Sequence, residues 1–167
     1  MPKLKVQANK NVREKDKAIV LKYVDLCLKE ICKKEHEINT VFRSPIKIQQ
    51  ARDNLLIKIR HSGLRARGGK QHISIDTSIF SSIVEYSSFA HDPVIGSMRC
   101  KSREKALAAV VAHELAHHVQ YRYGPYTRWL KSNYKKPHGE GFQAIYRILR
   151  SRIVNPIPDP KLEEEAA

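Results

Sequence analysis

A single helix, predicted from about Ser102 to Tyr123, constrains this chain more than any other feature. Ser102 can cap its N-terminus, and Gly124-Pro125 is a helix-ending signal. Apolar residues cover most of its circumference, which is typical of a buried helix. The helix nevertheless carries histidines and a glutamate. Because buried polar side chains need partners, and a metal ion can supply them, the helix favours a metal site.

Within that helix stands the segment His113-Glu114-Leu115-Ala116-His117. Four residues correspond to about 400° of rotation, so His113 and His117 project from one face about a turn apart. That spacing lets both imidazoles reach one zinc ion at about 2.0–2.1 Å. Glu114 is rotated by about 100° from His113, where it can take a proton from a water molecule at the metal. The pattern predicts two metal ligands and one general base.

The third ligand is predicted at His138, which lies 21 residues after His117. The intervening connection is long enough to return the chain, and His138 opens the last predicted helix, which runs to Ile153. His118 points about 140° away from His113 and is interpreted as structural. The other histidines are expected on the surface or in strands: His36, His61, His72 and His91. Three histidine ligands leave the fourth tetrahedral position open for water, which is typical of catalytic zinc.

The remaining residues predict one small domain that combines helices with a sheet. An amphipathic helix is expected over 12–34, because Val20, Val24, Cys27 and Ile31 recur at helical spacing. Residues 46–60 are compatible with strand or helix, with apolar alternation at 46–48 and at 56–59. The other predicted elements are strands at 64–67 and 72–76, a Gly68-Gly69 hairpin turn, a short helix within 77–90 and a loop over 91–101. We expect a flexible basic arm over 1–11, the folded domain over 12–154 and a disordered tail over 155–167.

Two segments resemble the SprT-like zinc metallopeptidase family, which includes Spartan-type DNA–protein crosslink proteases. They are HELAHHVQYRYG and, after an intervening loop, PHGEGFQAIYRIL, which share the family pattern of HExxH followed by HGxxF. The resemblance is specific over 102–153 and looser over 12–101. It implies an α+β, zincin-like single domain in which a small antiparallel sheet packs with helices and HExxH lies on the central helix. It also implies one Zn²⁺ per chain on His113, His117 and His138, with Glu114 as the catalytic base.

Charge indicates a polyanionic partner. The chain has a formal net charge of +14, and residues 43–70 contain eight basic residues and one acid. Such a balance favours nucleic acid, although charge that only keeps a basic protein soluble is the alternative. Many members of the family that the chain resembles carry a four-cysteine zinc ribbon, which is not found in this sequence. DNA contacts are therefore expected from basic segments near the site. The candidates are Arg65, Arg67, Lys70, Lys131, Lys135 and Lys136. The rings of Tyr126, Trp129 and Tyr134 are expected to stack on the bases of the DNA.

The functional hypothesis is zinc-dependent proteolysis of proteins bound or crosslinked to DNA, single-stranded DNA included. The alternatives are a nucleic-acid-binding module with a structural zinc and a metal-dependent hydrolase of a non-peptide bond. An oxyanion stabiliser is expected among four tyrosines, at 121, 123, 126 and 134, and the strand at 72–76 is a candidate edge for an extended peptide. We further expect a monomer without membrane association, reduced cysteines at 27, 32 and 100, and a cytoplasmic location, or a nuclear one in a eukaryote.

Overall fold

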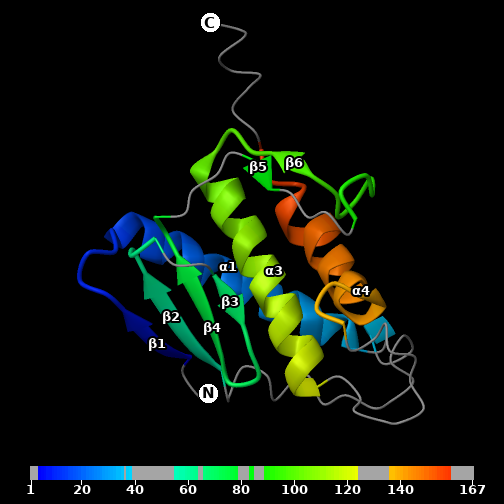
Figure 1. Ribbon diagram of the computed structural model, residues 1–167, viewed down its shortest axis with the longest axis horizontal. Helices are drawn as coiled ribbons and strands as arrows, with labels where there is room; N and C mark the ends of the chain where they lie inside the picture. The colour runs from blue at the N-terminus through cyan, green and yellow to red at the C-terminus, as the bar shows by residue number, and fades with distance from the viewer. Residues whose placement is uncertain are drawn as a thin grey trace, which may run out of the picture.

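The computed structural model describes residues 4–35, 37–38, 55–63, 66–78, 83–84, 89–123 and 136–158. These residues form a mixed α+β fold (Figure 1). The elements are β1 (Lys5–Ala8), α1 (Glu14–Lys33), β2 (Leu56–Arg60), β3 (Arg67–Gly68), β4 (His72–Asp76), β5 (Ile83–Val84), β6 (Met98–Arg99), α3 (Arg103–Tyr123), α4 (Glu140–Leu149) and the π-helical turn η3 (Arg150–Val154). No helix among the described residues is both long enough and apolar enough to cross a membrane.

The main sheet is mixed, and the expectation of an antiparallel sheet is wrong. Its strand order is β1-β2-β4-β3, in which β1 pairs with β2 and β2 with β4 in parallel, while β3 pairs with β4 antiparallel. Parallel neighbours need a crossover between them, and α1 lies within the connection that links β1 to β2. The alternation of apolar residues that predicted β2 and β4 is the same for both strand directions, so it could not separate them.

The predicted flexible arm at 1–11 contains the edge strand β1. Residues Lys5–Ala8 pair with Leu56–Ile59, and the backbone N–H of Asn9 donates to the Ile59 carbonyl at 3.0 Å. Lys5, Gln7 and Ala8 are exposed. Leu4 and Val6 alternate with lysines and pack against the core, and backbone hydrogen bonds hold the strand at the edge of the sheet.

The start of the predicted disordered tail is also ordered. The Asn155 side-chain amide donates to the Val94 carbonyl at 3.1 Å, and Ile157 packs against the core. Lys105 on α3 donates to the carbonyls of both Asn155 and Ile157. The chain is therefore fixed through Ile157, and the remainder of the predicted tail from 159 lies outside the described residues.

The core lies between one face of the main sheet and the helices. Ile57, Ile59, Ile73 and Ile75 are completely buried on that face, and α1 runs behind the sheet in Figure 1. The predicted helical stripe of α1 is confirmed, because Val20, Val24, Cys27 and Ile31 are all fully buried. All three cysteines are free thiols.

A buried ion pair joins the starts of α1 and α3. Asp16 is 1% exposed and accepts hydrogen bonds of 2.8 and 2.9 Å from the Arg103 guanidinium. Ser102 caps α3 as predicted, because its hydroxyl accepts a hydrogen bond from the Lys105 backbone N–H at 3.1 Å. The ion pair fixes the entry of the helix that carries the metal-ligand candidates.

Two expectations for the middle of the chain are wrong where the structure describes it. Ile83–Val84 and Met98–Arg99 form a small antiparallel pair, β5 with β6, instead of parts of a helix and a loop. Ile83 and Val84 are β-branched, which favours extended backbone over helix. The other residues of the predicted helix between 79 and 88 lie outside the described residues.

Candidate metal centre

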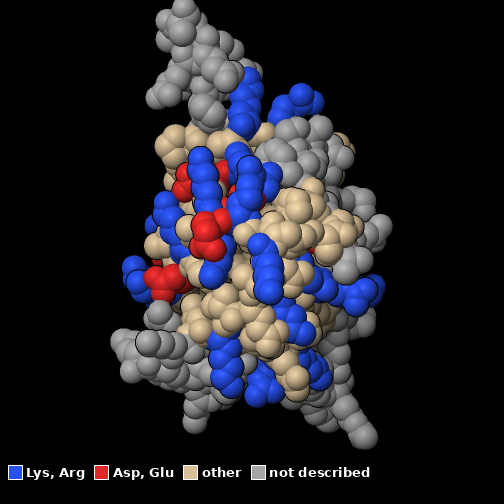
Figure 2. Space-filling view, turned by 90° about the vertical axis from the view of Figure 1, so that its left-hand side faces the viewer, with Lys and Arg blue, Asp and Glu red and all other residues tan. Residues whose placement is uncertain are grey.

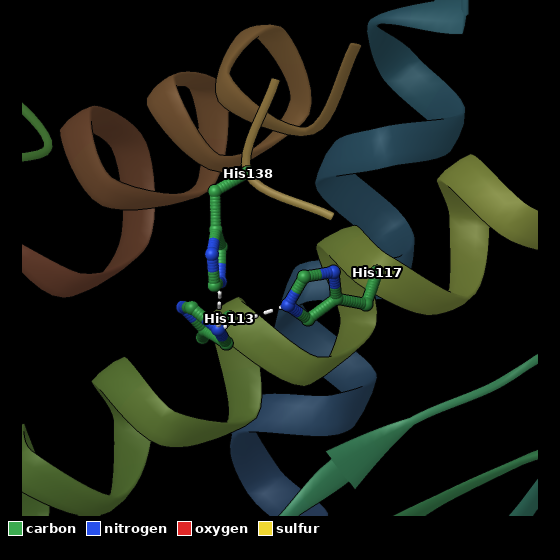
Figure 3. A group of neighbouring side chains, drawn as sticks. All are labelled: His113, His117 and His138. Atoms are coloured by element: carbon green, nitrogen blue, oxygen red, sulfur yellow. Dashed lines mark hydrogen bonds between the residues drawn. The ribbon is translucent and has the colours of Figure 1, made fainter. Parts of the chain in front are cut away.

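Helix α3 and the turn before α4 bring three histidine side chains together (Figure 3). The Nε2 atom of His113 lies 3.0 Å from His117 Nε2 and 3.2 Å from His138 Nε2. One ligand atom from each residue lies within 4.8 Å of the other two. The structure thus brings together the three ligands predicted from sequence, and they lie close enough to bind one metal ion.

The nitrogen spacing fits a tetrahedral ion. Metal–nitrogen bonds of 2.0–2.1 Å at tetrahedral angles separate two ligand nitrogens by about 3.3 Å. The two Nε2 distances are close to that value. An imidazole nitrogen offers one in-plane hydrogen or lone pair, so His113 Nε2 cannot serve both neighbours fully by hydrogen bonding. A shared cation at the centre would serve all three nitrogens, and imidazole ligands suit zinc, copper, iron and nickel.

Burial keeps the imidazoles in the form that binds cations. It lowers the pKa of His113 to about 2, with help from the neighbouring His117, and lowers that of His117 to about 4. Burial also lowers the pKa of His138. Neutral imidazoles carry the lone pairs that a metal needs, so the histidines require no proton loss at neutral pH before binding.

The ring of Phe142 on α4 contacts all three histidines of this cluster. Its ring centroid lies 4.8 Å from His113, 4.4 Å from His117 and 5.1 Å from His138, and the side chain is completely buried. Tyr121 stacks on His117 at 5.7 Å. Sequence reasoning assigned Phe142 only to an apolar stripe, although its place in HGxxF was a signal for contact with the histidines.

Two glutamines fix the backbone around His138. Gln120 on α3 donates its side-chain N–H to the Lys136 carbonyl at 3.0 Å. Gln143 on α4 donates in the same way to the His138 carbonyl at 2.8 Å. Neither glutamine was predicted as part of the site. A signal in the sequence was available for Gln120, which follows His117 by three positions and so lies on nearly the same face of the helix. The third ligand is therefore positioned by both helices.

Glu114 lies on α3 beside the first ligand and is 7% exposed. Burial raises the pKa of its carboxyl group to about 8. A carboxyl group with a pKa near neutrality can both accept and return a proton, which is the property of a general base.

Strand β3 lies directly against the backbone of α3. A Cβ atom on Gly68 would lie 2.7 Å from His117 Cβ and would collide with the Glu114 carbonyl oxygen. Gly68 is therefore a strand residue at a close approach, and the expected turn falls one residue later, where the Gly69 N–H donates to the His72 carbonyl at 2.9 Å. His118 Nδ1–H donates to the Gly69 carbonyl at 2.6 Å, which confirms its structural role.

The described candidates for DNA contact are exposed. Arg67 is exposed on β3, Lys70 is exposed in the following turn, and Lys136 is exposed two residues before His138. The strand at 72–76 is not an edge, because β4 lies between β2 and β3; the edge beside α3 is β3. Outside the described residues lie Arg65, Lys131, Lys135, Tyr126, Trp129, Tyr134, His36 and the side chain of Tyr123.

Comparisons with models of protein families, with curated proteins and with solved structures found no match.

Proposed function

We propose that this chain is a zinc-dependent peptidase that acts on proteins bound to DNA. The observation that carries the proposal is the convergence of three imidazole nitrogens from His113, His117 and His138, with Glu114 on the same buried helix. Among the described residues, no fourth His, Cys, Asp or Glu joins this cluster. That ligand count supports a catalytic site over a structural zinc, which takes four protein ligands.

The chemistry would follow from the residues around the site. A bound zinc ion would supply a Lewis acid for the scissile carbonyl and lower the pKa of water. The Glu114 carboxylate would accept a proton from the attacking water and deliver it to the departing amine. Phe142 would exclude water from the back of the site and hold the imidazole rings in place. Tyr121 is the one tyrosine of the four candidates whose ring contact with a ligand is described, through its stack on His117.

Strand β3 offers a place for the substrate backbone. It ends the sheet order, and its residue Gly68 touches the helix that carries Glu114 and His117. An extended peptide pairing with this edge would lie alongside the site, since main-chain hydrogen bonds bind peptides without regard to sequence. The short length of β3, two residues, is compatible with one or two such bonds.

The formal charge of +14 supports the part of the proposal that concerns DNA, because a basic protein is attracted to a polyanion that carries its substrates. The proposal is tested by metal analysis of the purified chain together with cleavage of an unfolded protein substrate, with and without single-stranded DNA. We expect close to one zinc per chain and cleavage that is lost in Glu114→Gln. Zinc with four protein ligands and no cleavage would instead favour a structural metal. Hydrolysis of an ester or amide probe without peptide cleavage would favour the non-peptide hydrolase.

A further inference from the structure

The outer face of the main sheet carries rows of side chains that point away from the core. The register places Lys5, Leu56 and His72 in one row. The next row is Gln7, Lys58, Ser74 and Arg67, and the last is Arg60 and Asp76. Successive residues of a strand point to opposite faces, so these rows lie opposite the buried isoleucines of β2 and β4. In Figure 1 α1 runs behind the sheet. The buried isoleucines belong to the same core cluster as Val20, Val24 and Ile31 of α1.

Four cations stand on this face: Lys5, Lys58, Arg60 and Arg67. Lys5 and Arg67 are exposed, and Lys58 and Arg60 are half-buried. Burial lowers the pKa of His72, and the charges of Lys58 and Arg60, which lie on the adjacent strand, lower it further. The acid in these rows, Asp76, is buried and accepts hydrogen bonds from the hydroxyls of Ser62 and Ser78.

Two lysines of α1 and the lysine that follows it are paired with acids. Lys22 pairs with Glu104 at 3.0 Å, Lys29 with Asp25 at 2.8 Å and Lys34 with Glu37 at 2.8 Å. Within the part of the chain that the structure describes, Lys5, Lys58, Arg60 and Arg67 form no ion pair. Figure 2, a view from the β1 side, shows that Lys and Arg outnumber Asp and Glu on that surface. The outer sheet face therefore carries four cations that no ion pair with a described residue neutralises.

We propose that this outer sheet face binds the phosphate backbone of DNA. Its cations stand on β1, β2 and β3, across a width of about 14 Å at 4.8 Å per strand, and Lys58 and Arg60 are separated by about 6.6 Å along β2. Ser74 and Asp76, the residues of β4 in the same rows as Lys58 and Arg60, are buried. That area is sufficient to contact several phosphates of one DNA segment. No Phe, Tyr or Trp stands in the three rows, so we expect the contacts to be to phosphates rather than to bases, with little sequence preference.

An anionic membrane is the competing polyanion, and the surface disfavours it. Membrane-surface binding uses apolar side chains beside the cations. Among the described residues, Leu26 on α1 is the exposed large apolar side chain, and it does not belong to the sheet. The inference specifies where the DNA of the proposed function lies, and it holds whether or not the metal centre cleaves peptides. Because Arg67 precedes Gly68, DNA on this face would lie beside the strand that contacts the metal-binding helix.

The test measures binding of the full chain to a labelled DNA duplex and to one of its strands over a series of salt concentrations. The variant Lys5→Gln/Arg67→Gln changes two exposed cations on edge strands, which limits damage to the fold. Each phosphate contact contributes about 0.9 to the slope of log affinity against log salt on a duplex, so the slope should decrease by up to about 1.8. The control Lys22→Gln/Lys29→Gln removes equal charge from paired helix positions and should leave the slope nearly unchanged.

Further measurements complete the test. Thermal unfolding and zinc content of each variant separate a lost DNA contact from a damaged fold or metal site. If the double variant is unstable, Lys5→Gln alone should still lower the slope by about 0.9. Equal losses in the variant and its control, or unchanged DNA binding in the variant, would overturn the proposal. So would binding to phosphatidylserine vesicles, but not to DNA, that depends on these residues.

Discussion

The side-chain amide of Gln143 donates a hydrogen bond of 2.8 Å to the backbone carbonyl of His138. Gln120 donates to the carbonyl of Lys136, so α4 and α3 each hold one end of the segment that carries the third histidine. The position of His138 relative to His113 and His117 consequently depends on two amide groups that do not face the metal themselves.

Replacing Gln143 by Glu is expected to weaken zinc binding by about tenfold, as for other outer contacts that orient ligands. The carboxylate is nearly isosteric with the amide but cannot donate to the His138 carbonyl. Competition with a chromophoric chelator measures the affinity, and the visible spectrum of the Co²⁺ form reports the ligand geometry. The control is Gln7→Glu, the same change at an exposed position of β1. Equal affinity and identical spectra in both variants would show that Gln143 does not position the ligand.

Replacing His138 by Ala is expected to lower the zinc content well below one per chain and to reduce thermal stability in the presence of zinc. The physical reason is that metal binding adds to the free energy of folding, and two ligands hold the ion more weakly than three. Metal analysis and melting curves with and without a chelator provide the measurement. Replacing His91, which is exposed, by Ala should change neither quantity. Full zinc content in the His138 variant would require a different third ligand.

The Glu114→Gln variant is expected to keep its zinc and its fold while turnover decreases by about 10²–10⁴-fold. Glutamine has nearly the same shape as glutamate but cannot take the proton of the attacking water. Single-turnover cleavage of a protein substrate measures the effect, and metal analysis confirms the loaded state. Near-normal turnover in a zinc-loaded variant would show that Glu114 is not the general base.

The Gly68→Ala variant is expected to destabilise the fold by about 1–3 kcal/mol, because the new methyl group has no room against α3. The strand must move away from Glu114 and His117, so cleavage should also decrease. The matched control is Gly69→Ala, where a Cβ atom would make an ordinary contact at 3.6 Å with the His72 carbonyl oxygen. Chemical denaturation provides the free energies of unfolding. Similar stability losses in both variants would contradict the role of the close approach.

The buried Asp16–Arg103 pair predicts a dependence of stability on pH. Hydrogen bonds from Arg103 hold the pKa of Asp16 below its ordinary value. A carboxyl group with a lowered folded-state pKa stabilises the fold above its unfolded pKa of about 3.9 and loses that contribution as the pH falls below it. Asp16→Asn should therefore cost about 1.5–3 kcal/mol at neutral pH, and the difference from the unmodified chain should shrink below about pH 4. A difference that stays constant from neutral pH to pH 3 would contradict this assignment.

The sequence was sufficient where the decisive interactions are local. Helix α3 could be predicted because its cap, its periodicity and the spacing of His113 and His117 all lie within one segment. Strand direction could not, since apolar alternation is the same in parallel and antiparallel pairs. The edge strand β1 carries only a short alternation of Leu4, Val6 and Ala8, which its basic surroundings obscured. The contacts of Gln120 and Gln143 depend on how two helices meet. Gly68 was predicted to lie in a turn, whereas it lies in a strand that closely approaches α3. Such an approach produces no pattern in the neighbouring residues of the sequence.

The three histidines all lie between 113 and 138, in the last third of the chain, whereas α1 and the main sheet come from residues 5–76. During synthesis α1 and the main sheet therefore leave the ribosome first, and the core that they share with α3 is completed only later. A nascent chain that ends before residue 138 presents two of the three imidazoles and holds a metal ion only weakly. We therefore expect a metal ion to be held by all three imidazoles only after residue 138 has been synthesised.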